Sequence, residues 1–500
     1  MNLTNNTGIE KLHMYIEASG EIVDHIPPDP ANIAVVILAA GKGTRMRSKL
    51  PKVLHPLLGE PMIYHLLRAV RHTGIPPERT AIVVGYSGEE VANVVKKQGN
   101  YLIVYQDEQL GTGHAVKCAE NELTKLENAD TTHVLVLLGD GPLVKAHTLN
   151  RLIQSHLTSN PLVTLVTTEA ENPYGYGRII RDGKERFCQI IEEAELLPQQ
   201  RNLKEINPSL YLFQGKWLWE NLRRLEKHPA KGEYYLTDLP AMALKTIAAD
   251  ELHPVQTMKT DFEEVLGIND RVQLAEAEII MRHRVLRQHM LNGVTIVDTA
   301  STYISATARI EADTILEPNT HIRGKCIIKK GCVIGPNTIL VEATIGENCV
   351  INASMVENST LKNNVSIGPF SHVRPGCMLE EGVYMGNFAE VSRAHIGADS
   401  KQSHFSFIGD ATLGKKVNVG AGTITANYDG KNKNKTIIGD NVFIGSDSIL
   451  RAPLTLGDDA TTGAGSIVTK NVEPGVTVVG MPARPIRRKS VSENTENKEE

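Results

Sequence analysis

Short hydrophobic runs alternate with segments of helical spacing through the first half of the chain. The runs that predict buried strands lie at residues 33–39, 81–84, 102–105, 133–138 and 163–167. Between them, residues 62–71 and 114–127 place apolar side chains every three to four positions, as amphipathic helices do. This alternation predicts an α/β fold in which helices cover both faces of a mainly parallel sheet.

Aliphatic residues recur every six positions in the second half of the chain. The first series is Ile304, Ile310, Leu316, Ile322, Ile328, Ile334 and Leu340. The phase slips by one residue at Ile345 and Ile351 and resumes from Leu361 to Val391. After an interruption it returns at Ile438. A period of six, often with a small residue next, predicts a parallel β-helix whose aliphatic side chains stack inward. A short-stranded sandwich is the alternative, but its turns are spaced irregularly.

Breaks in the two patterns predict the domain boundaries. The run Pro27-Pro28-Asp29-Pro30 ends a segment that precedes the first strand. Residues 270–292 lack glycine and proline, and as a helix they would reach on the order of 35 Å. The expected segments are an N-terminal extension at 1–32, a first domain at 33–269, a connector helix at 270–292, a β-helix domain at 293–488 and a polar tail at 489–500.

The composition argues against several classes of protein. Hydrophobic residues make up 41% and charged residues 22%, as in a globular protein, and the net charge of -5 gives no reason to expect a nucleic-acid partner. The 6 cysteines show no C-x-x-C spacing, which favours reduced thiols. The longest apolar runs, such as 134–138, fall far short of the ~20 residues of a membrane span. The polar start lacks a signal-peptide profile, so we expect a cytoplasmic protein without membrane insertion.

The loop after the first strand is a candidate phosphate site. Residues 38–46 read LAAGKGTRM, and LPK follows at 50–52. Backbone amides in such a turn can approach phosphate oxygens, and Arg45 and Lys52 can neutralise a leaving pyrophosphate. A dinucleotide loop would need glycine where Met46 stands, and a Walker loop would need Gly-Lys-Ser/Thr at its end. On the loop alone, a phosphate site and an ordinary turn are equally favoured.

The loop and the segments that follow resemble sugar-nucleotide pyrophosphorylases. The further segments are 106–115 (QDEQLGTGHA), 138–143 (LGDGPL), 175–178 (GYGR), Glu192, 205–207 (EIN), 233–238 (EYYLTD) and 267–271 (GINDR). Asp140 and Asn269 could each be a simple helix or turn cap. The order of so many matching segments outweighs that alternative.

This resemblance implies a Rossmann-like nucleotidyltransferase domain that uses UTP and Mg²⁺. It implies nucleotide contacts from Leu38, Ala39, Gly41, Lys52, Gln106, Gly111 and Thr112, and sugar contacts from Gly177, Glu192 and Asn207. Arg45 and Lys52 would be catalytic, and Asp140 and Asn269 would hold the metal. Mg²⁺ would offset the repulsion between two polyanions, so that positioning suffices and no covalent nucleophile is needed.

The β-helix resembles the acetyltransferase half of the bifunctional bacterial enzymes that make UDP-N-acetylglucosamine. The resemblance rests on the polar insertion at 421–433, the segment 400–410 and the ending GMPAR at 480–484. It implies a left-handed β-helix in a homotrimer, with His404 as general base oriented by Glu390. The implied sugar contacts are Arg374, Asn418, Asn427, Tyr428 and Lys433, and the implied acetyl-CoA contacts are Asn427, Tyr428, Ser446, Ala464 and Arg484.

The combined resemblance implies acetyl transfer from acetyl-CoA to glucosamine-1-phosphate, then uridylyl transfer from UTP to N-acetylglucosamine-1-phosphate. Two residues depart from the family pattern, namely Ser392 in place of a phosphate-binding lysine and Phe407 in place of a tyrosine. Each change removes a bond worth roughly 1.5–3 kcal/mol. The alternative is therefore a β-helix that only assembles or regulates the enzyme, or that acetylates a different acceptor.

Overall fold

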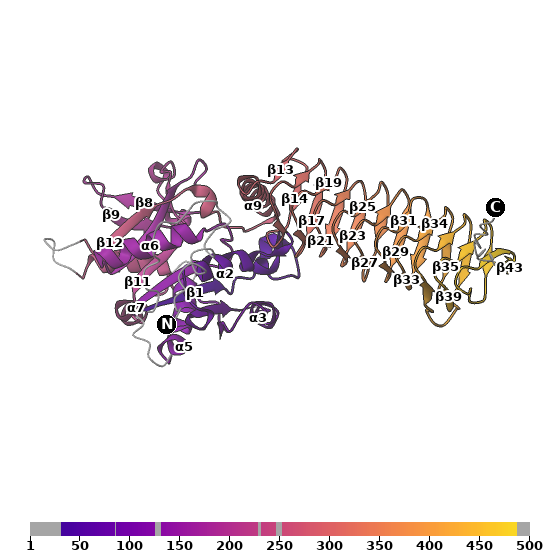
Figure 1. Cartoon of the computed structure of the whole chain (residues 1–500). Coiled ribbons are helices and arrows are strands. Elements are labelled where there is room, and N and C mark those ends of the chain that lie inside the picture. Colours follow the sequence, from indigo (N-terminus) through magenta and orange to yellow (C-terminus); the bar gives the residue numbers. More distant parts are fainter. Residues whose placement is uncertain (1–31, 86, 126–131, 229–231, 247–252, 488–500) are drawn as a thin grey trace, which may run out of the picture. The chain divides into compact units, whose positions relative to one another are not determined.

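The computed structural model describes residues 32–85, 87–125, 132–228, 232–246 and 253–487. It divides into two compact units, one up to Met281 and one from Arg282 (Figure 1). The expected N-terminal extension, apart from Asn32, and the expected tail lie outside the described residues. None of the described helices is long and apolar enough to cross a bilayer.

The first unit is built on one sheet, with the strand order β5-β4-β1-β6-β11-β7-β10-β8-β9 and with β12 beside β7. Its parallel part consists of β1 (Ile33–Ala39), β4 (Thr80–Val84), β5 (Leu102–Tyr105) and β6 (His133–Leu138). These strands match the predicted hydrophobic runs. Their carboxyl ends share one edge, which places the loop after β1 next to the loop after β6.

The other part of the sheet is largely antiparallel, so the expectation of a mainly parallel sheet holds for only part of it. It comprises β7 (Val163–Glu169), β8 (Gly177–Arg181), β9 (Phe187–Ile191), β10 (Glu205–Asn207), β11 (Tyr211–Gln214) and β12 (Val255–Lys259). Strands β8 to β10 are short and partly exposed. They therefore lack the continuous apolar run that marks a buried strand.

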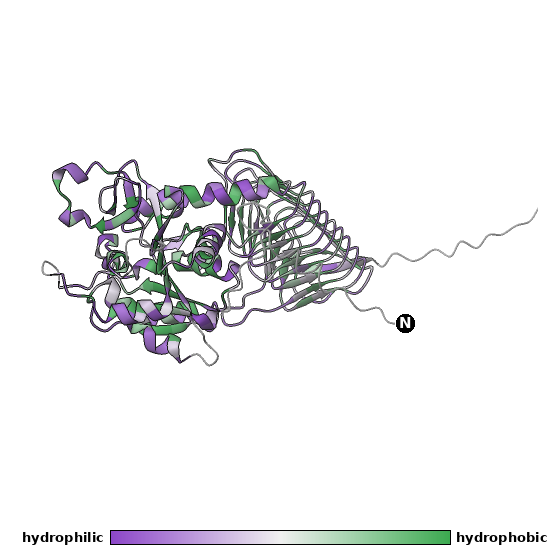
Figure 2. Cartoon of the chain, turned by 90° about the vertical axis from the view of Figure 1, so that its left-hand side faces the viewer, coloured by the Kyte–Doolittle hydropathy of each residue, from purple (hydrophilic) through white to green (hydrophobic). Residues whose placement is uncertain are grey.

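Helices cover both faces of this sheet. Alternate residues of β1 point to opposite sides, with Ile33, Val35 and Ile37 in one core cluster and Ala34 and Val36 in the other. The first cluster includes residues of α2 (Met62–His72), α3 (Gly88–Lys96) and α6 (Ala146–Ser159). The second includes residues of α4 (Thr112–Cys118), α5 (Glu120–Thr124), α7 (Gly215–Leu222) and α8 (Leu239–Leu244). The hydrophobic colouring of the strands in Figure 2 fits this packing.

The second unit is a parallel β-helix. Its described residues form sheets of 12, 10 and 9 short strands, through which the chain passes in turn. Inward residues stack one coil apart; for example, Ile304 of β14 (Tyr303–Ile304) pairs with Ile322 of β17 (His321–Arg323), and Ile322 pairs with Leu340 of β20 (Ile339–Val341). All three side chains are buried. The six-residue period is thereby confirmed as a β-helix, and the sandwich alternative is wrong.

Departures from the repeat have direct structural counterparts. The one-residue slip at Ile345 gives a coil one residue shorter, because β18 (Ile327–Ile328) pairs with β21 (Thr344–Ile345). The polar insertion expected at 421–433 begins later than expected, because residues 424–426 remain in the coil as β35 (Ile424–Ala426). The chain leaves the coil after β35 and returns to it at β36 (Thr436–Ile438). Leu413 therefore pairs with Ile438, across a longer stretch of chain than elsewhere.

The predicted connector is α9 (Arg271–Leu291). Its first turn is capped by Asp270, whose Oδ1 accepts hydrogen bonds from the backbone amides of Val272 and Gln273, both at 2.9 Å. Because Asp270 caps the helix, Asn269 is left available for another role. The capping alternative for Asn269 is thus not what the structure shows.

Candidate active sites

The loop after β1 brings Lys52 toward the strand end. Gly43 has φ +59°, and a Cβ there would lie 2.7 Å from the Cβ of Lys52. Only glycine allows so close an approach in this conformation. Lys52 begins the short 3-10 helix η3 (Lys52–Leu54), while Arg45 lies in η2 (Thr44–Met46).

Asp140 and Asn269 meet at this loop. The ammonium of Lys52 pairs with the carboxylate of Asp140 and lies 3.3 Å from Oδ1 of Asn269. Nη2 of Arg45 donates to the same Asn269 oxygen at 2.8 Å. The amide of Ile268 donates to the backbone oxygen of Asp140 at 2.9 Å, which holds the two segments together. Four residues from three separate segments therefore converge: the loop after β1, the loop after β6 and the segment before α9.

The oxygens gathered here suit a hard divalent cation. Oδ1 of Asp140 is buried and has no hydrogen-bond partner among the described residues. Oδ1 of Asn269 faces the positively charged side chains of Arg45 and Lys52. The described residues contain no cluster of three or more histidine, cysteine or acidic side chains that could hold a metal. A carboxylate with few other protein ligands is typical of Mg²⁺, which keeps waters and substrate phosphates as its remaining ligands.

Two adjoining cavities meet at Asp140. The first, about 440 Å³, is lined by all seven residues expected to bind the nucleotide: Leu38, Ala39, Gly41, Lys52, Gln106, Gly111 and Thr112. The second, about 380 Å³, is lined by the expected sugar residues Gly177, Glu192 and Asn207 and by Arg45 and Asn269. Asp140, Leu138, Glu192 and Ser209 line both cavities. The structure thus brings together every residue that the sequence predicted for this half.

The carboxamide of Gln106 is held in one orientation. Its Nε2 lies 3.1 Å from the carbonyl oxygen of Gly111 and 3.1 Å from Nδ1 of His114. A carbonyl oxygen only accepts hydrogen bonds, so the group facing it must be the NH₂. No described residue donates a hydrogen bond to the amide oxygen of Gln106, so this oxygen can accept one from a ligand in the first cavity.

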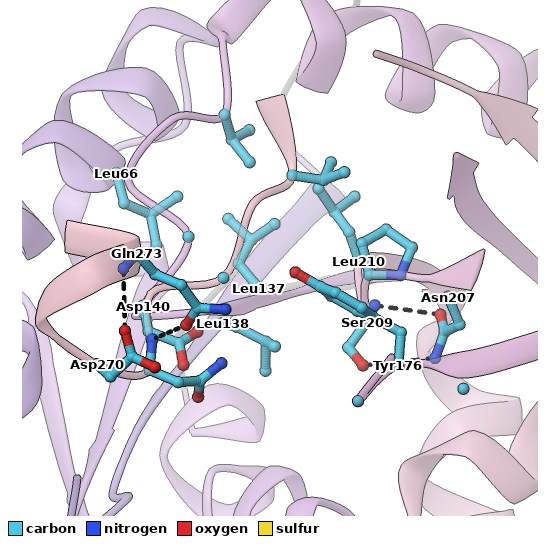
Figure 3. A pocket seen from close by; sticks show the side chains of 18 of the residues that line it. Leu66, Leu137, Leu138, Asp140, Tyr176, Asn207, Ser209, Leu210, Asp270 and Gln273 are labelled. Atoms are coloured by element: carbon cyan, nitrogen blue, oxygen red, sulfur yellow. Dashed lines mark hydrogen bonds between the residues drawn. The ribbon is translucent and has the colours of Figure 1, made fainter. Parts of the chain in front are cut away.

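The sugar-side cavity is shown in Figure 3. Oδ1 of Asn207 accepts the backbone amide of Ser209 at 3.1 Å. Behind the cavity wall, Nδ2 of Asn207 donates to the hydroxyl of Tyr211 at 2.6 Å. On the other side, Oε1 of Gln273 accepts the backbone amide of Asn269 at 2.8 Å. Ser209 and Gln273 also line this cavity, although no sequence motif includes them. Gln273 lies one helical turn beyond Asn269, a spacing that could have identified it.

In the second unit, His404 lies on the surface between β31 (Lys401–Gln402) and β32 (Ser406–Gly409). Glu390 of β29 (Ala389–Ser392) binds Arg374, whose Nη1 lies 2.9 Å from Oε1 of Glu390. The structure thus pairs Glu390 with Arg374 rather than with His404. Ser392 is only 2% exposed, so its side chain does not reach the surface where a phosphate would bind.

A polar cluster lies at the base of the insertion. Arg393 binds Asp410 through Nε at 2.6 Å and Nη2 at 2.9 Å, and Asn427 donates to Asp410 at 2.5 Å. The Arg393 hydrogen bond holds the pKa of Asp410 below its usual value, and Asn427 and Lys433 lower it further. Tyr428 forms an isolated bridge with Lys433 across the insertion. Asn427, Tyr428 and Lys433 are therefore neighbours, as expected.

The remaining predicted residues lie on other coils. Asn418 is in β34 (Asn418–Val419), which pairs with β31 next to His404. The backbone carbonyl oxygen of Ser446 accepts a hydrogen bond from the backbone amide of Gly465 at 2.8 Å. The corner that carries Ser446 therefore stacks on the corner that carries Ala464. Arg484 lies in β43 (Ala483–Arg487), antiparallel to β42 (Thr477–Gly480).

Known proteins resemble this chain through both of its halves. The family model for the MobA-like NTP transferase domain matches residues 35–238, and hexapeptide-repeat models match 307–341 and 435–470. The bifunctional protein GlmU of Streptococcus uberis is 44% identical over 452 residues, 90% of this chain and 96% of that protein. GlmU of Streptococcus mutans is 45% identical over 445 residues, 89% of this chain and 94% of that protein. The chain belongs to the GlmU family.

Membership in the GlmU family decides between the two readings of the β-helix. The match runs through both units and includes the hexapeptide repeats. The chain is a bifunctional enzyme, with uridylyl transfer in its nucleotidyltransferase unit and acetyl transfer in its β-helix. A purely scaffolding β-helix is therefore set aside.

Proposed function

We propose that the β-helix acetylates glucosamine-1-phosphate from acetyl-CoA, and that the first unit then joins the product to UTP, releasing pyrophosphate. The observation that carries this proposal is the meeting of the nucleotide and sugar cavities at Asp140, beside Lys52, Arg45 and Asn269. A sugar-phosphate oxygen in one cavity would face the α-phosphorus of a nucleotide in the other.

In uridylyl transfer, Asp140 and Asn269 would hold Mg²⁺, which supplies charge neutralisation between the two phosphates. Lys52 and Arg45 would stabilise the negative charge on the departing pyrophosphate. The free amide oxygen of Gln106 would accept the N3–H of uracil. Glu192 and Asn207 would orient the sugar hydroxyls, so that positioning lowers the barrier.

In acetyl transfer, the amine of glucosamine-1-phosphate would attack the thioester carbonyl. The N–C bond forms as the C–S bond breaks, and His404 would accept the amine proton and pass it to the coenzyme A thiolate. Arg374, Asn418, Asn427, Tyr428 and Lys433 would hold the sugar phosphate. Asn427 and Tyr428, with Ser446, Ala464 and Arg484, would also bind acetyl-CoA.

We also propose that the enzyme is a homotrimer in the cytoplasm. Phe370 and Phe388 are 62% and 58% exposed, and their rings stack 5.5 Å apart at a corner of the β-helix. Phe405, next to His404, is exposed as well. Exposed aromatic residues in a row are typical of an interface, and a neighbouring β-helix would cover them. UTP and acetyl-CoA are cytoplasmic metabolites, which supports the location.

Two single substitutions test whether each unit catalyses one of the two transfer reactions. Asp140→Ala should reduce uridylyl transfer at least 100-fold, because the metal ligand is lost, and leave acetyl transfer within twofold. His404→Ala should reduce acetyl transfer at least 100-fold, because the general base is lost, and leave uridylyl transfer within twofold. Pyrophosphate release and acceptor-dependent thiol release are measured on the same preparations, with exposed Glu171→Ala as control. Loss of both activities in a folded Asp140→Ala protein would contradict the proposal.

A further inference from the structure

His228 bridges two carboxylates beside the sugar site. Its Nδ1 lies 3.1 Å from Oε1 of Glu195, and its Nε2 lies 3.0 Å from Oδ2 of Asp238. The ring also stacks on that of Tyr235, with centroids 4.0 Å apart and an interplanar angle of 26°. None of the motifs considered above includes His228.

The two hydrogen bonds determine the protonation of the ring. Ionised carboxylates only accept, so both ring nitrogens must donate, and only an imidazolium does that. Partial burial alone would lower the pKa of His228, but the hydrogen bonds and charges of Asp238 and Glu195 outweigh it and raise the pKa. Within the described part of the chain, the ring contacts three titratable side chains, those of Glu195, Asp238 and Tyr235.

The two carboxylates belong to the segments that line the cavities. Glu195 ends η5 (Glu193–Glu195), which directly follows Glu192. Asp238 ends η7 (Leu236–Asp238), which contains Thr237. Thr237 donates to Oε1 of Glu192 at 3.0 Å, and both residues line the nucleotide cavity. His228 therefore joins the backbone that carries Glu192 to the backbone that carries Thr237.

We propose that His228, as an imidazolium, is a positioning residue that, through Thr237, holds Glu192 in place for the sugar phosphate. This inference rests on the proposed function of the two cavities. Loss of the proton would leave a ring lone pair facing one carboxylate, and the bridge would weaken. Because the pKa of His228 is raised, the bridge is intact at lower pH and is lost as pH rises through that pKa.

The test is the KM for N-acetylglucosamine-1-phosphate in uridylyl transfer, measured from pH 6 to 9. In the wild type, KM should rise about threefold across the titration of His228, as expected for a partly exposed ion pair. In His228→Ala, KM should be raised at low pH and should lose this dependence, with kcat changed less than twofold. Ionisation of the sugar phosphate itself affects all variants alike, and His253→Ala is the matched control, because His253 lines neither cavity.

A titration by NMR of ¹³C-labelled histidine supplies a readout independent of activity. One histidine signal should titrate above the ordinary value, disappear in His228→Ala and shift down in Glu195→Gln. Glu195→Gln also serves if His228→Ala does not fold. If the wild type catalyses uridylyl transfer and His228→Ala shows the same KM profile, the inference is overturned and the proposed function stands. A wild type without uridylyl transfer would overturn the proposed function instead, and the inference with it.

Discussion

At the scale of single residues, Asp410 connects Arg393 to Asn427, which is expected to contact both sugar and acetyl-CoA. We predict that Asp410→Asn lowers kcat/KM for acetyl transfer about tenfold or more, because the charge-assisted bonds that orient Asn427 are lost. Uridylyl transfer should not change. The measurement is thiol release at varied acceptor concentration.

Asp399→Asn is a matched control for this change. Asp399 and Asp410 are both corner residues with positive φ, at 58° and 49°, and asparagine tolerates that conformation. The control should retain full activity. If Asp410→Asn also acetylates normally, the Arg393–Asp410–Asn427 cluster has no role in positioning the substrates.

In the first unit, sequence motifs predicted the residues of the candidate site but not the residues that support them. Asp140 and Asn269 were identified by motif resemblance, and the structure places both beside Lys52. Ser209 and His228 belong to no motif, because their roles depend on segments that only the folded chain brings together. In the second unit, the buried position of Ser392 could not be foreseen, since the repeat predicts only the inward aliphatic residues.

At the scale of elements, the stacked aliphatic residues should dominate the stability of the β-helix. Leu340 in β20 is fully buried, whereas its neighbour Ile339 in the same strand is partly exposed. We predict that Leu340→Ala lowers the free energy of unfolding by about 2–5 kcal/mol, through lost burial and a cavity. Ile339→Ala should cost less than about 1 kcal/mol. Urea unfolding of the two variants compares them, and equal losses would contradict inward stacking.

The elements differ in how well their patterns predict them. The β-helix repeats one pattern, so its period could be counted along the sequence. The parallel strands of the first unit are continuous apolar runs and could also be predicted. Strands β8 to β10 are short and half-exposed, so they lack the continuous apolar run that marks the parallel strands. The strand β10 also pairs with β7 and β8, which lie well before it in the sequence.

At the scale of the whole molecule, the chain combines two units that each carry one transfer reaction. The first unit makes its site where loops from the parallel strands meet the end of the antiparallel part. In the second unit, the proposed site lies where the insertion leaves the regular repeat, near the segment that carries His404. In both units, the proposed catalytic groups lie where the repeating or layered core ends and loops present polar side chains.

The most direct test of the account is a crystal structure of the enzyme with UDP-N-acetylglucosamine and Mn²⁺, in which anomalous scattering locates the metal. We predict one metal peak at about 2.0–2.2 Å from oxygens of Asp140 and Asn269, bridging to the diphosphate. The uracil should face Gln106, and the sugar should lie in the cavity lined by Glu192 and Asn207. A metal and a nucleotide sugar bound away from Asp140 and Asn269 would contradict the account.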